Sequence, residues 1–155
     1  MIIWFPQEQL TSCVAACIRM ALTGFRQNLS EKQIRRILGS STIGYTLFQA
    51  HQQMRLLGVD ATLHDDWSLV DLRDCLRDGW NPIIGIDRQF LGHQTSSHAV
   101  VVVAVSSHAI QFFDPLGSSM PENVSLETFE NAWGGAAKQA LVIKSPFPQI
   151  GEIKP

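Results

Sequence analysis

The strongest constraint on the fold of this chain is a run of seven apolar residues, AVVVVAV, at positions 99–105. β-Branched residues dominate the run, which favours a strand, and a strand that is apolar at every position must be covered on both faces. We therefore expect a central strand over residues 98–105. Residues 13–22 are apolar except for Arg19, a pattern typical of a helix buried on nearly all sides. Packing this helix on the central strand would bring Cys13 close to one end of that strand.

The other patterns predict helices in the first half of the chain and strands in the second. Two helix starts are marked by a hydroxyl residue followed three positions later by glutamine, Ser30 with Gln33 and Thr46 with Gln49. The predicted helices cover residues 13–23, 30–38, 46–57, 68–78 and 125–133, and the predicted strands cover residues 59–63, 82–86, 98–105, 109–113 and 138–144. Residues 88–97 are expected to lack regular structure. Helices followed by a largely antiparallel sheet indicate the α+β class.

Length and charge narrow the class of protein. A chain of 155 residues is long enough for one core and short for two, so we expect a single domain over residues 1–155. Twelve Lys and Arg against fourteen Asp and Glu give a net charge of −2, which argues against nucleic acid as a partner. The start MIIWFPQEQ does not resemble a signal peptide, and no apolar run approaches the roughly 18 residues that span a bilayer. Three cysteines, an odd and small number, favour the reducing cytoplasm over a disulfide scaffold.

Cys13 stands at the predicted first position of the buried helix, behind Thr11 and Ser12, either of which can cap that helix. A helix N-terminus and a nearby imidazolium both lower the pKa of a thiol and make the nucleophilic thiolate available. Free cysteine is also among the most buried residue types, so position alone does not separate a nucleophile from a core residue. Cys17, one turn further, and Cys75, on the apolar stripe of its helix, are predicted to be core residues.

A nucleophilic thiol needs a base and a group that orients the base, and His98 and Asp114 are the candidates. His98 begins the central strand and Asp114 ends the next one. If the two strands form a hairpin with a three-residue loop at residues 106–108, Asp114 lies opposite Val100 and on the same face as His98. A two-residue loop would put the pair on opposite faces. The remaining histidines, which have no evident orienting group, are His51, His64, His93 and His108.

The negatively charged oxygen of a tetrahedral intermediate needs hydrogen-bond donors beside the nucleophile. The backbone N–H of Cys13 and a side-chain amide such as that of Gln7 would supply them, with Gln9 as a competitor.

Taken together, these residues resemble the papain-like cysteine peptidases of the bacteriocin-processing, double-glycine leader type. The likeness consists of a glutamine six positions before a helix-opening cysteine, a distant histidine before an apolar strand, and an Asp-Pro pair. It implies a papain-like fold with Cys13 as nucleophile, His98 as base, Asp114 as the group that orients His98, and Gln7 as oxyanion donor. It also implies a peptide or protein substrate and no cofactor.

Other functions are left open by the sequence. A transamidase or deconjugating hydrolase would use the same thioester intermediate. A catalytically silent domain that binds a peptide without cutting it is the alternative from another class. A metal site built on Cys13, Cys17 and a histidine is disfavoured, because the second pair of ligands that structural zinc requires is absent. The oligomeric state is not indicated.

Overall fold

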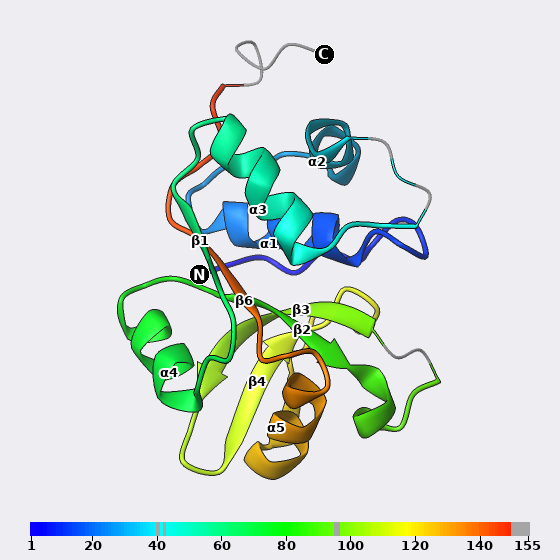
Figure 1. The fold of residues 1–155 in the computed structure, drawn as a ribbon, viewed down its shortest axis with the longest axis vertical. Coiled ribbons are helices and arrows are strands. Elements are labelled where there is room, and N and C mark those ends of the chain that lie inside the picture. Colours follow the sequence, from blue (N-terminus) through cyan, green and yellow to red (C-terminus); the bar gives the residue numbers. More distant parts are fainter. Residues whose placement is uncertain (40, 42, 95–96, 150–155) are drawn as a thin grey trace.

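In the computed structural model, which describes residues 1–39, 41, 43–94 and 97–149, helices lie on both sides of one antiparallel sheet (Figure 1). The capping boxes predicted at Ser30 and Thr46 are both present, since each hydroxyl accepts from the backbone N–H three residues later and each glutamine side chain accepts in return. The helices are α1 (Cys13–Thr23), α2 (Glu31–Leu38), α3 (Leu47–Leu56), α4 (Leu69–Arg77) and α5 (Leu126–Gly134).

The described part of the sheet has six strands in the order β1-β6-β2-β3-β4-β5, all paired antiparallel. The long strand predicted from the valine run lies inside the sheet, between β2 and β4. The strands are β1 (Ala61–His64), β2 (Ile83–Asp87), β3 (Ser97–Val105), β4 (Ala109–Phe113), β5 (Glu122–Ser125) and β6 (Ala140–Ile143).

Both faces of β3 are buried, as its composition requires. Ala99 and Val101 belong to the core cluster that includes the buried side of α1, and Val100 and Val102 belong to the cluster that includes α4 and α5. Figure 1 shows the two layers, with α1, α2 and α3 above the sheet and α4 and α5 below it. The helix that opens with Cys13 packs on β3. The predicted α+β fold, with a buried N-terminal helix packed on an antiparallel sheet, is confirmed.

Two elements were not predicted. The edge strand β5 has mostly exposed side chains, so it shows no apolar alternation. A short 3-10 helix, η1 (Arg88–Leu91), lies in the stretch expected to lack regular structure. The Asp87 carboxylate caps it by accepting from Gln89 N at 3.0 Å, and Gly92 ends it at a φ of 84°. Residues 95 and 96 of that stretch lie outside the described residues. Within the described ranges, no helix has the length and apolar character needed to cross a membrane.

Candidate active site

Cys13 is the first residue of α1, and its side chain is half-buried. Packing fixes the position of α1, because eight of its eleven residues are buried. Cys17, one turn further, is fully buried, and burial raises its pKa well above that of an ordinary thiol. Burial likewise raises the pKa of Cys75 to about 11. The three cysteines therefore differ in environment, and Cys13 is the accessible one.

The cap of α1 departs from the prediction. Ser12 occupies the cap position, but its side chain makes no capping hydrogen bond. Its hydroxyl oxygen accepts from Gln9 N at 3.0 Å and lies 3.0 Å from both Gln9 O and Glu31 Oε1, either of which can take its proton. Of the two predicted caps, Thr11 and Ser12, Ser12 has the cap position but forms no side-chain cap, because a buried carboxylate and the preceding turn bind its hydroxyl in place of the helix.

The imidazole of His98 and the carboxylate of Asp114 are in direct contact. His98 Nε2 lies 2.6 Å from Asp114 Oδ1, and both side chains are buried. Since Nε2 is bound to the carboxylate, Nδ1 is the ring nitrogen left for another partner. The two residues predicted to work together are brought together by the structure.

The strand register explains this contact. Near the turn, Val105 pairs with Ile110, and continuing that register would set Asp114 opposite Val101, with its side chain on the face opposite to that of His98. A β-bulge at Val103 shifts the register, so that Val102 pairs with Phe112 and Asp114 falls at the position opposite Val100. The predicted position of Asp114 is confirmed, but a bulge produces it, not the length of the turn alone.

Three further groups surround Asp114. Leu116 N donates to Oδ1 at 2.8 Å, Arg88 Nη2 lies 3.7 Å from Oδ2, and Trp4 Nε1 donates to the backbone carbonyl at 2.9 Å. Burial would raise the pKa of Asp114, but the hydrogen bond and charge of His98, the Leu116 N–H and the Arg88 guanidinium together lower it. Asp114 is therefore held ionised and fixed in position.

The pKa of His98 is shifted in the opposite direction, upward. Burial alone would lower its pKa, but the hydrogen bond with Asp114, an interaction with the Cys13 side chain, and the charges of both groups outweigh burial and raise the pKa above its usual value near 6.5. The imidazolium form is thus stabilised between a carboxylate and a thiol. This is the arrangement that favours proton transfer from thiol to imidazole.

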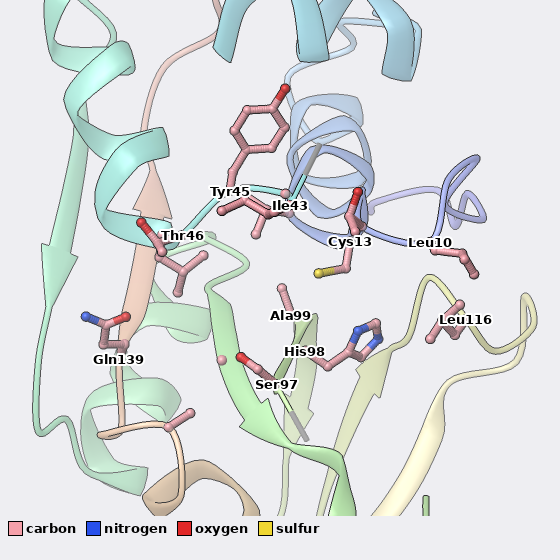
Figure 2. A pocket seen from close by; sticks show the side chains of 16 residues that line it. Leu10, Cys13, Ile43, Tyr45, Thr46, Ser97, His98, Ala99, Leu116 and Gln139 are labelled. Carbon is pink, nitrogen blue, oxygen red and sulfur yellow. The ribbon is translucent and has the colours of Figure 1, made fainter. Parts of the chain in front are cut away.

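Cys13 and His98 line the same cavity, of about 400 Å³. Figure 2 shows Cys13 at the start of α1 and His98 on β3 below it, with Ala99 to one side and the backbone of residues 43–46 closing the cavity on one side. Small residues also line the cavity, among them Gly85, Ala99 and Ala136. Exposed apolar side chains of Leu10, Ile43 and Leu116 stand at its margin.

Gln7 lies in the segment that leads to Cys13, but its side chain does not line this cavity. Its amide nitrogen donates to the carbonyls of Gln9 at 2.8 Å and Leu10 at 3.2 Å, and its amide oxygen is buried with no hydrogen-bond partner in the described structure. The backbone N–H of Gln7 donates to Pro115 O at 3.0 Å, which ties this segment to the residue after Asp114. The role predicted for Gln7 remains a prediction.

The other histidines are engaged elsewhere or exposed. His51 Nε2 binds Ala61 O at 3.0 Å, and His64 Nε2 binds Thr62 Oγ1 at 2.8 Å while its ring stacks on Trp67. His93 and His108 are exposed. Over the described residues, no group of three or more His, Cys, Asp or Glu side chains is placed to hold a metal ion.

Two contacts of the site were missed by sequence reasoning. Arg88 was placed in a stretch expected to be irregular, and Trp4 was given no role. No local sequence pattern predicts that either residue contacts Asp114, because an arginine after a strand and a tryptophan near a chain start are ordinary features. Only the antiparallel pairing of β2 with β3, in which Asp87 faces Ser97, hints that Arg88 lies close to His98.

Comparison with known proteins gives one family and several similar structures. The model of the Peptidase C39 family matches residues 2–145. No curated protein matches the chain. A C39-like peptidase from Bacillus anthracis shares 15% identity, with a TM-score of 0.73 over 96% of this chain and 100% of that one. The peptidase domain of the Streptococcus transporter ComA shares 18%, with a TM-score of 0.73 over 92% and 98%.

A third structure is a double glycine motif protease from an AMS/PCAT transporter, in complex with its leader peptide. It shares 17% identity with this chain, with a TM-score of 0.69 over 93% of each. At these identities the structures establish a shared fold, and the family model carries the assignment of family.

Proposed function

The chain belongs to the Peptidase C39 family, and from this premise we propose that Cys13, His98 and Asp114 are the catalytic triad of a papain-like cysteine peptidase. The observation that carries the proposal is the 2.6 Å contact of His98 with Asp114 at the edge of the cavity that Cys13 opens into. We propose that a single domain over residues 1–155 performs this activity. The bond cleaved is proposed to be a peptide or isopeptide bond.

The proposed reaction follows from the free nitrogen of His98. Because Nε2 is bound to Asp114, Nδ1 takes the proton of the Cys13 thiol, and the thiolate attacks the substrate carbonyl carbon to form an S–C bond. His98 then returns this proton to the leaving amine as the C–N bond breaks, which leaves a thioester on Cys13. A water molecule gives a proton to His98 and attacks the thioester, and the acid product leaves as Cys13 is regenerated.

The oxyanion would be stabilised beside Cys13. The first N–H groups of a helix have no partner within the helix, so the N–H of Cys13, the first residue of α1, is a candidate donor. Gln7 is the second candidate. To donate to the substrate, its amide must release one of the two backbone carbonyls that it now binds, and the bond to Leu10 O is the longer of the two at 3.2 Å.

We propose as substrate a peptide with small residues beside the cleaved bond. Gly85 and Ala136 pack closely in the cavity wall, because a Cβ at Gly85 would come within 3.3 Å of the Ala136 Cβ. One of the similar structures is a protease named for a double glycine motif. A peptide containing Gly-Gly is therefore the first probe to use with this chain.

Alkylation of the native protein by iodoacetamide tests the nucleophile. Cys13 is expected to be modified at neutral pH, whereas Cys17 and Cys75, at 0% and 6% exposure, should react only after unfolding. Substituting His98→Ala should slow the labelling of Cys13 about tenfold by removing the positive partner of the thiolate. Mass spectrometry of peptides after timed labelling locates and quantifies the modification.

The exposed histidine His93 provides the control, since His93→Ala should leave the labelling rate unchanged. Labelling of Cys13 that is equally fast with and without His98 would contradict the thiolate–imidazolium pair. That result would favour the alternative function, a domain that binds a peptide without cutting it.

Gln7→Ala is expected to lower kcat by about 10²-fold with little change in KM, because an oxyanion donor acts mainly in the transition state. Gln9→Ala should do much less. Gln9 joins the turn through its backbone N–H and carbonyl, which the substitution retains. Steady-state cleavage of a Gly-Gly peptide, with melting temperature as a check on folding, measures both variants. Equal losses in the two would mean that another group stabilises the oxyanion.

A further inference from the structure

Glu31, the first residue of α2, is a fully buried carboxylate. Its Oε1 accepts from Glu8 N at 2.9 Å and lies 3.0 Å from the Ser12 hydroxyl, and its Oε2 accepts from Arg35 Nε at 3.1 Å. Burying a carboxylate is costly, and an apolar side chain of similar size is often tolerated better at such a position. Two of the three groups that it binds lie in the segment between Gln7 and Cys13, away from α2 in sequence.

These contacts fix both ends of one loop. Glu8 directly follows Gln7, and Ser12 directly precedes Cys13, so the Glu31 carboxylate binds the residue next to each proposed oxyanion donor, through the Glu8 N–H and the Ser12 hydroxyl. Inside the loop, Gln9 N donates to Ser12 Oγ, and the Gln7 amide binds the carbonyls of Gln9 and Leu10. The side chains and backbone of residues 7–12 thus form one hydrogen-bonded turn anchored on Glu31.

The anchor also determines what Ser12 does. A serine at the cap position normally accepts from the backbone N–H groups of the first helical turn. Here the Ser12 hydroxyl is bound to the loop and to Glu31 and makes no cap, so it joins the start of α1 to the loop.

We propose that Glu31 is a positioning residue for the oxyanion hole: it binds the loop of residues 8–12 at both ends and so aligns the Gln7 amide with the start of α1 at Cys13. This inference rests on the proposed function, since it needs Cys13 as nucleophile. Glu31 does not touch the substrate and acts through the loop.

The test compares two reagents that both attack Cys13. A peptide aldehyde, acetyl-Gly-glycinal, adds to the thiol to give a hemithioacetal, whose S–C bond forms as the carbonyl oxygen becomes an oxyanion or hydroxyl that sits in the hole. Iodoacetamide forms its S–C bond by displacing iodide and develops no oxyanion. An effect on the oxyanion hole should therefore appear in the aldehyde Ki and not in the alkylation rate.

Glu31→Ala is expected to weaken aldehyde binding at least about tenfold, while the alkylation rate stays within about twofold of the wild type. Glu31→Gln should restore most of the affinity, because its amide oxygen can still accept from Glu8 N and Ser12. Ser12→Ala, which removes one anchor and little volume, should give an intermediate loss and serves if Glu31→Ala fails to fold. Glu8→Gln is the matched control. It removes a carboxylate that pairs with Arg35 but keeps the Glu8 backbone N–H.

Several results would overturn the inference. Unchanged aldehyde binding in Ser12→Ala and Glu31→Ala, or parallel losses of aldehyde binding and alkylation, would show that Glu31 is only a structural residue. Loss of affinity in Glu8→Gln equal to that in Glu31→Ala would assign the effect to the charge network around Arg35. A wild-type protein that binds the aldehyde no better than Cys13→Ala would overturn the proposed function and this inference with it.

Discussion

Cys13→Ala is expected to lower kcat for peptide cleavage by at least about 10⁴-fold, because without the thiol no thioester can form and only residual binding effects remain. The fold should persist. Cys13 is half-buried at the helix start, and the packing of α1 depends on the eight buried residues that follow it. Mass spectrometry of a Gly-Gly peptide mixture measures the loss, and a melting curve checks the fold.

Cys17→Ala is the matched control, one turn further along the same helix. Cys17 is fully buried, so its loss leaves a small cavity and should lower the melting temperature, while activity per folded molecule stays within about threefold of the wild type. Retained cleavage in Cys13→Ala would place the nucleophile elsewhere. Wild-type protein that binds the peptides and leaves them intact would favour the peptide-binding alternative. A product joined to an added amine would indicate transamidation.

The layers of the fold could be predicted because their signals are local. The valine run of β3 requires cover on both faces, and the capping boxes at Ser30 and Thr46 mark helix starts through contacts three residues apart. Each prediction depended on neighbours in sequence, for which side-chain spacing carries enough information. The edge strand β5 was missed for the converse reason. Its residues pair with β4 through backbone hydrogen bonds while most of their side chains are exposed, so the sequence shows no alternation of apolar and polar residues there.

The register of the β3–β4 hairpin shows where sequence reasoning about the site reaches its limit. A three-residue turn predicts Asp114 opposite Val100, which is where it lies. The pairs beside the turn follow another register, however, and the bulge at Val103 shifts the strands into the register that puts Asp114 there. Val103 is one of four successive valines, so nothing in the sequence marks it as the extra residue. The contact of His98 with Asp114 therefore depends on a feature of the tertiary structure.

The surroundings of the site were less predictable than the residues themselves. A hydroxyl residue before a helix predicts a cap, and Ser12 would cap α1 if Glu31 did not bind it from 19 positions away. Arg88 approaches Asp114 from a 3-10 helix, and Trp4 binds the Asp114 carbonyl from the start of the chain. Such long-range polar contacts follow from the way α1, α2 and the sheet pack together. No short sequence pattern predicts that packing.

Asp114→Asn is expected to reduce kcat/KM by about 10³- to 10⁴-fold, because asparagine fills the same space but no longer stabilises the imidazolium or holds the ring of His98 in its productive form. The pH profile should change as well. Burial would lower the pKa of His98, and the hydrogen bond with Asp114 is the first of the interactions that raise it instead. Since His98 must be protonated to give a proton to the leaving amine, the alkaline limb of the wild-type profile should lie above pH 6.5 and move to lower pH in Asp114→Asn.

Glu122→Gln, an acid-to-amide change at an exposed position near Gly117, is the control and should leave both rate and profile unchanged. A loss of rate in Asp114→Asn with the alkaline limb unmoved would mean that Asp114 acts on the position of His98 and not on its protonation.

The lowered pKa of Asp114 and the raised pKa of His98 predict how the free energy of unfolding depends on pH. Asp114 has a lowered pKa, so its contribution to the free energy of unfolding is present above its ordinary value near 3.8 and is lost as pH falls through the value in the folded protein. His98 has a raised pKa, so its contribution is present below about 6.5 and is lost as pH rises through its folded value. The wild type should therefore exceed Asp114→Asn in unfolding free energy most strongly between about pH 4 and pH 6.5. Urea unfolding of both proteins across this range measures the difference, and a difference independent of pH would show that the two groups do not form an ion pair in the folded protein.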